Sequence, residues 1–90
     1  MTPASKLRKQ VYDYLKPRGY MIINLIGTKP SGMPDLLVET AIDHIYIELK
    51  AEGDTLKPNQ RIVQGKLKLL GCKVYNIRTI EELKEILWNQ

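Results

Sequence analysis

The middle of the chain carries two acids, a lysine and a glutamine whose types and order suit hydrolytic chemistry. Asp35 follows a proline in "GMPD", and Glu48 and Lys50 alternate with apolar residues in "YIELK". Gln60 ends the segment "LKPNQ". Mg²⁺ prefers oxygen ligands and is commonly held by one or two carboxylates together with water and substrate phosphate. The four residues therefore indicate a metal-dependent site, provided that the fold brings them together.

Two alternating runs, residues 35–40 and 44–50, predict the antiparallel hairpin that would do so. A short turn between them places Asp35 opposite Glu48, and directly paired residues share a face with Cβ atoms about 4.5–5.5 Å apart. Lys50 lies on the same face as Glu48, because side chains alternate along a strand. The hairpin thus predicts one cluster of all three residues.

Two opposed carboxylates repel each other unless a cation or a proton lies between them. Mg²⁺ or Mn²⁺ bound by Asp35 and Glu48 would remove that repulsion, and the backbone carbonyl of Leu49 could supply a further oxygen. Lys50 would then orient the attacking water, assist its deprotonation or stabilise charge on phosphorus. Alone, an exposed Glu-x-Lys or an Asp after proline is usually a surface pair or a turn. Only the combination favours metal-assisted phosphodiester hydrolysis.

The remaining patterns predict an α/β fold with the order α-β-β-β-α-β-α. Helices are expected at residues 3–16, from a cap at Thr55 to about Leu70, and at residues 79–88. The outer strands are expected at residues 20–26 and 72–77. Cys72 is expected to be buried in the second of these strands. A helix that joins two strands allows them to run parallel. We therefore expect one domain over residues 1–90, a mixed central sheet flanked by helices.

Composition excludes several other classes of protein. The 90 residues have a formal net charge of +4 and contain one cysteine and one histidine, so neither an internal disulfide nor the usual zinc site is expected. No apolar run is long enough for a membrane span, and the N-terminus lacks the apolar core of a signal peptide, which favours a cytoplasmic protein. The glycines match no nucleotide-binding fingerprint, so no organic cofactor is expected.

The segments "GMPDLLV", "YIELK" and "LKPNQ" together resemble the virus-type replication-repair nuclease (VRR-NUC) domain, a branch of the PD-(D/E)XK phosphodiesterases. The resemblance covers nearly the whole chain and implies a restriction-endonuclease-like core. It also implies that Asp35 and Glu48 bind Mg²⁺ or Mn²⁺, that Lys50 is catalytic and that Gln60 completes the site. Free-standing phage members of this type resemble homodimeric DNA endonucleases that act on branched DNA, such as flaps and four-way (Holliday) junctions in DNA repair.

One departure from the family pattern keeps other functions open. The family usually has a glutamate near the start of its first helix, where this sequence has Ala4. The loss could weaken metal binding, remove a second metal or leave a catalytically weak DNA-binding domain. A small α/β interaction protein whose acidic pair is incidental is the third hypothesis.

Five residues are candidates for contacts with a DNA backbone: Lys29 and Ser31 in the loop before the acidic residue, and Lys57, Arg61 and Lys68 along one stripe of the second helix, beside Gln64. Phosphate contacts of this kind supply most sequence-independent affinity for DNA. An ordinary solvated helix face would have the same composition, so both interpretations remain.

Apolar residues on the helices predict both a core and an interface. The second helix should face the core with Leu56, Val63, Leu67 and Leu70. Ile62, Leu69 and Trp88 lie off the predicted core stripes, and small chains often bury such residues in a two-fold interface. They could equally lie under loops.

Overall fold

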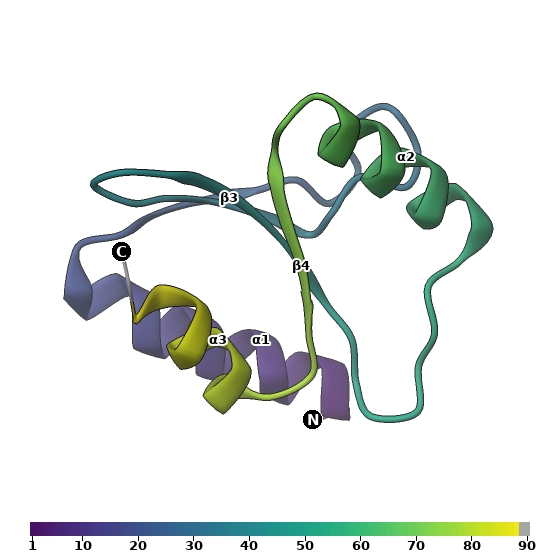
Figure 1. Cartoon of the computed structure of the whole chain (residues 1–90). Coiled ribbons are helices and arrows are strands. Elements are labelled where there is room, and N and C mark those ends of the chain that lie inside the picture. Colours follow the sequence, from purple (N-terminus) through teal and green to yellow (C-terminus); the bar gives the residue numbers. More distant parts are fainter. Residues whose placement is uncertain (89–90) are drawn as a thin grey trace.

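The computed structural model describes residues 1–88 and confirms the predicted order α-β-β-β-α-β-α. The helices are α1 (Pro3–Leu15), the 3₁₀ turn η1 (Lys16–Arg18), α2 (Pro58–Leu69) and α3 (Ile80–Leu87), and the strands are β1 (Met21–Asn24), β2 (Leu36–Glu39), β3 (His44–Leu49) and β4 (Lys73–Ile77). Figure 1 shows α1 and α3 side by side on one face of the sheet and α2 on the other. None of the described helices is long and apolar enough to cross a membrane.

The sheet is mixed, with the strand order β1-β2-β3-β4. The pairs β1–β2 and β2–β3 are antiparallel, and β4 runs parallel to β3 after the α2 crossover. In the central hairpin Leu36 pairs with Ile47 and Leu37 pairs with Tyr46, so the predicted register is confirmed. Continued by one residue, that register places Asp35, directly before β2, opposite Glu48.

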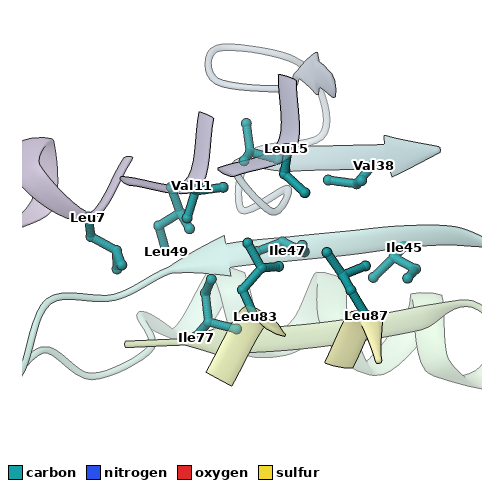
Figure 2. Close-up of a cluster of buried hydrophobic side chains, with 11 residues drawn as sticks. Leu7, Val11, Leu15, Val38, Ile45, Ile47, Leu49, Ile77, Leu83 and Leu87 are labelled. Atoms are coloured by element: carbon teal, nitrogen blue, oxygen red, sulfur yellow. The ribbon is translucent and has the colours of Figure 1, made fainter. Parts of the chain in front are cut away.

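The core fills the space between the sheet and the pair α1/α3 (Figure 2). Strand β3 contributes its alternate residues Ile45, Ile47 and Leu49, and they pack against apolar side chains of the helices and neighbouring strands: Leu7, Val11, Leu15, Leu36, Val38, Ile77, Leu83 and Leu87. Figure 2 shows Leu7 of α1 close to Leu49 at the end of β3. The N-terminal half of α1 is thereby held beside the end of the central strand.

The opposite face is organised differently, and several expectations for α2 were wrong. The helix begins at Pro58, with Lys57 as its N-cap, and not after a cap at Thr55. The first N–H of a helix has no partner within the helix, so proline, which has no N–H, suits that first position. Residues 51–57 form a loop that Arg78 holds, donating hydrogen bonds of 2.8 and 2.6 Å to the carbonyls of Ala51 and Asp54.

Three further side chains differ from prediction. Leu70 is 80% exposed, because the buried positions of α2 are Val63 and Gln64 and the C-terminal end of the apolar stripe is left uncovered. Gln64, expected beside the exposed basic stripe, is buried. Cys72 is half-buried and precedes β4, since Gly71 turns the chain at a φ of 87° that favours glycine. The outer strands were also predicted slightly too long.

Candidate active site

The predicted site residues meet where β3 ends. Glu48 is the penultimate residue of β3, Lys50 follows the strand, and Gln60 lies in the first turn of α2. Glu48 is 3% exposed and Lys50 8% exposed. Charged groups are rarely buried to this extent unless they are paired, because desolvation costs free energy. The cluster is therefore a buried polar site on the sheet face covered by α2.

Gln60 links the two charged residues of β3. Its amide oxygen accepts a hydrogen bond of 2.8 Å from the Lys50 Nζ, and its Nε2 donates one of 3.3 Å to the Glu48 Oε2. The same amide oxygen accepts from the backbone N–H of Lys57, as a capping residue of α2 does. Lys50 Nζ lies 3.5 Å from Glu48 Oε2. Gln60, at the start of α2, thus holds the Lys50 Nζ and the Glu48 Oε2 in position.

Asp35 approaches the same strand end from β2. Its Oδ2 accepts a hydrogen bond of 2.9 Å from the backbone N–H of Leu49. Its Oδ1 lies 3.9 Å from Nη2 of Arg8, which comes from α1. Sequence reasoning missed Arg8, because only the packing of α1 beside the end of β3 brings it to the site. No local motif around Arg8 signals this contact.

One oxygen of Glu48 is available for a ligand. Its Oε1 is buried and has no hydrogen-bond partner among the described residues. Burial and the negative charge of Asp35 raise the pKa of Glu48 to about 6 from 4.5, against the opposing effect of Lys50. An unpaired buried carboxylate oxygen is costly, and a bound cation would offset that cost.

The donor set fits a hard divalent cation that keeps several waters. No group of three or more His, Cys, Asp or Glu side chains suited to a metal occurs in residues 1–88. Asp35 and Glu48 provide two carboxylates, and Mg²⁺ is usually held by that number with water and phosphate completing its shell. In a strand the N–H and C=O of one residue point the same way, so the carbonyl of Leu49 lies on the side of Asp35.

The loop before Asp35 is fastened to the start of α2. Ser31 Oγ accepts a hydrogen bond of 2.9 Å from the side chain of Asn59. Gly32, at a φ of 98°, lies so close to Asn59 that an added Cβ would stand 2.5 Å from its carbonyl oxygen. A side chain at this position would push the loop away from the helix. Gly32 therefore holds Ser31 beside the helix start that carries Gln60.

The other predicted DNA contacts are on the surface. Lys29, Lys57, Arg61 and Lys68 are all exposed, as are Ser31 and Ala4. Ala4 lies one helical turn before Arg8 on α1. The first helix therefore places the positive charge of Arg8, and no acid, beside Asp35. The charges at the site balance, with one carboxylate near each of two cations.

A second polar pair joins α2 to the sheet. Gln64 and Asn76 exchange two hydrogen bonds, of 2.8 and 3.0 Å, through their side-chain amides. Asn76 of β4 is the register partner of Glu48. The pair therefore fixes α2 across the sheet one turn after Gln60.

Comparison with known proteins identifies the fold. No protein-family model matches the chain, and no curated protein matches it. The chain is similar to a solved structure described as a "VRR_NUC domain", with a TM-score of 0.81 and 19% sequence identity over 99% of this chain and 98% of that one. This likeness confirms the predicted restriction-endonuclease-like α/β fold, and the fold resemblance inferred from the three motifs holds over the full length.

Proposed function

We propose that this protein is a Mg²⁺- or Mn²⁺-dependent DNA endonuclease that hydrolyses phosphodiester bonds. The observation that carries the proposal is the buried, unpaired Oε1 of Glu48, flanked by Asp35, Lys50 and Gln60. A core selected for stability alone would leave neither a buried carboxylate oxygen without a partner nor a second acid beside it. The similar fold of a structure described as a "VRR_NUC domain" supports the same conclusion.

Asp35, Glu48 and the Leu49 carbonyl would hold the cation. When bound, the cation would supply positive charge against the oxygens of the scissile phosphate. Lys50, held by Gln60, orients the attacking water and stabilises negative charge developing on phosphorus. A bond forms between the water oxygen and phosphorus while the bond from phosphorus to the leaving sugar oxygen breaks. The water loses a proton, and the leaving oxygen gains one.

The substrate in this proposal is branched DNA, such as a flap or a four-way junction. Lys29, Ser31, Lys57, Arg61 and Lys68 would contact its phosphates along the loop and α2 that adjoin the site. Among residues 1–88 no element resembles a module that reads base edges in the major groove, which favours selection by DNA structure.

We expect a homodimer, with the exposed side of α2 as its interface. Ile62 and Leu69 on this helix are exposed by 62% and 89%. Trp88 is also 85% exposed, but it ends α3 on the opposite face of the sheet and lies outside this interface. A hollow of about 300 Å³ between α2 and the loop before β2 is lined by Met33, Ile62, Leu67 and Leu70, among other residues. Light scattering after gel filtration should give twice the chain mass for the parent and the monomer mass for Ile62→Glu. A monomeric parent at high concentration would contradict the interface.

Cleavage of labelled duplex, flap and four-way junction DNA with Mg²⁺ tests the function. The parent should cut branched substrates, and Lys50→Ala should lose cleavage by orders of magnitude while DNA binding remains. Lys9→Ala is the matched control, because Lys9 pairs with Asp13 on the exposed side of α1. Equal cleavage by the parent and Lys50→Ala would refute the catalytic assignment.

A catalytically weak DNA-binding domain is the alternative function. The presence of Arg8 beside Asp35, without an acid at Ala4, favours it, because a nearby cation weakens metal binding. This alternative predicts salt-dependent DNA binding with neither cleavage nor a change in melting temperature on adding Mg²⁺.

A further inference from the structure

Arg8 is placed against the candidate site yet makes only one weak contact there. Its Nη2 lies 3.9 Å from Asp35 Oδ1, beyond hydrogen-bond distance, and its side chain is 30% exposed. The guanidinium makes no hydrogen bond to any of residues 1–88. A guanidinium carries five N–H donors, so most of its capacity is unused at this position.

Two other arginines, Arg18 and Arg78, are committed to the fold, whereas Arg8 is not. Arg78 donates to the carbonyls of Ala51 and Asp54. Arg18 donates to the carbonyl of Tyr14, and its guanidinium lies 3.7 Å from the centre of the Tyr14 ring. Arg8 has no comparable structural role, although its neighbour Leu7 is in the core. The fold holds the arginine beside Asp35 without using its donors.

The charge balance indicates what those donors would bind. Without a metal, Arg8 offsets the charge of Asp35, and Lys50 offsets that of Glu48. A divalent cation bound between the carboxylates would offset the charges of Asp35 and Glu48. The positive charges of Arg8 and Lys50 would then be left in excess. An anion would then be favoured beside Arg8. The planar guanidinium matches phosphate geometry through two parallel hydrogen bonds.

We propose that Arg8 is a substrate-binding residue that holds a DNA phosphate at the site once the cation has engaged Asp35. The assignment rests on the proposed function and extends it, because the first helix, which has Ala4 where an acid was expected, then supplies a phosphate contact through Arg8 instead. Arg8 and the cation repel each other while no DNA is bound. They bind the same phosphate group when it is present.

Opposite changes in two affinities test the role of Arg8. In Arg8→Gln, Mg²⁺ without DNA should bind equally well or more tightly, because a positive charge beside Asp35 is removed. Junction DNA with Mg²⁺, measured by fluorescence anisotropy in a Lys50→Ala background, should bind about tenfold more weakly, and its salt slope should fall by about one. Arg8→Lys, which keeps the charge but not the planar fork, should lie between the parent and Arg8→Gln.

Lys9→Gln is the control, because it removes the same positive charge from the same helix. It should leave the Mg²⁺ concentration at half-maximal binding unchanged. Unchanged DNA affinity in Arg8→Gln would overturn the assignment. A parallel loss of Mg²⁺ and DNA binding would also overturn it, because Arg8 would then only support Asp35. The parent reports on the proposed function separately: if it neither cleaves nor gains melting temperature with Mg²⁺, the proposed function itself fails.

Discussion

The two faces of β3 differ in what they bury. Toward α1 and α3 the strand presents Ile45, Ile47 and Leu49, which join a continuous apolar core. Toward α2 it presents the nearly inaccessible Glu48, with Lys50 just beyond the strand end. One strand therefore serves as a structural support on one face and as the base of a polar site on the other.

The difference shows how a small chain separates stability from chemistry. Burial of apolar surface stabilises the fold by about 25 cal/mol per Å², and 11 of the 13 buried apolar side chains in residues 1–88 belong to the cluster on the α1/α3 side. The α2 side contains a carboxylate whose oxygen lacks a partner, an arrangement that lowers stability. Substitutions on the α1/α3 side should accordingly change mainly the free energy of unfolding, and substitutions at the polar site should change mainly the cleavage rate.

The largest effect is expected from Glu48→Gln on cleavage. The substitution removes a proposed metal ligand, and a metal ion supplies several kcal/mol of charge stabilisation in the transition state. Since about 1.4 kcal/mol corresponds to a factor of ten, the rate with Mg²⁺ should fall about 10³-fold. The rise in melting temperature that Mg²⁺ gives the parent should vanish as well.

Asp35→Asn should behave in the same way, whereas Glu39→Gln, at the far end of β2, should keep both the cleavage rate and the Mg²⁺ effect. Retention of the melting-temperature rise in both site variants would mean that the cation binds elsewhere.

Ile47→Ala should have the largest effect on stability. Ile47 is fully buried between the sheet and the helices, and removing such a side chain typically costs about 2–5 kcal/mol. Urea denaturation should show this loss in the free energy of unfolding, while the folded fraction keeps its cleavage activity. Tyr46→Ala is the control on the other face and should cost less, because Tyr46 is only half-buried. An equal loss for both would remove the distinction between the faces.

The apolar face was largely predictable from the sequence, and the polar face only in part. Alternation in residues 35–40 and 44–50 predicted the hairpin and its register, because a shift by one residue would turn Ile47 out of the core. The same register brought Asp35 and Glu48 together. Arg8 and Gln64 could not be predicted, since their positions depend on how α1 and α2 pack against the sheet.

The pair Gln64–Asn76 should have an intermediate effect on stability. Gln64→Ala leaves the Asn76 amide without its partner. Because Asn76 is exposed and can bond to water instead, the loss should lie near the lower end of the about 1–3 kcal/mol that an unpaired buried group costs. A double-mutant cycle with Asn76→Ala, followed by urea denaturation, should give a favourable coupling energy. Additive losses would show that the two amides do not act together. Activity should also fall, because the pair orients the helix that carries Gln60.

The smallest expected effect is a pH-dependent difference in stability between the parent and Glu48→Gln without metal. The pKa of Glu48 is raised from 4.5 to about 6, first by burial and then by the charge of Asp35. The folded state therefore holds this proton more tightly than the unfolded chain. The stability that the proton contributes is fully present below pH 4.5 and is lost as the pH rises through 6.

The variant cannot titrate at this position, so its advantage over the parent should grow between pH 4.5 and 6 and level off above about pH 7. Urea denaturation across this range measures the difference, and a constant difference would contradict the raised pKa. Mg²⁺ at pH 7 should reverse the order of stability, because the cation stabilises only the parent, whose carboxylate it can bind. The charge that destabilises the face toward α2 would then be the same charge that binds the metal.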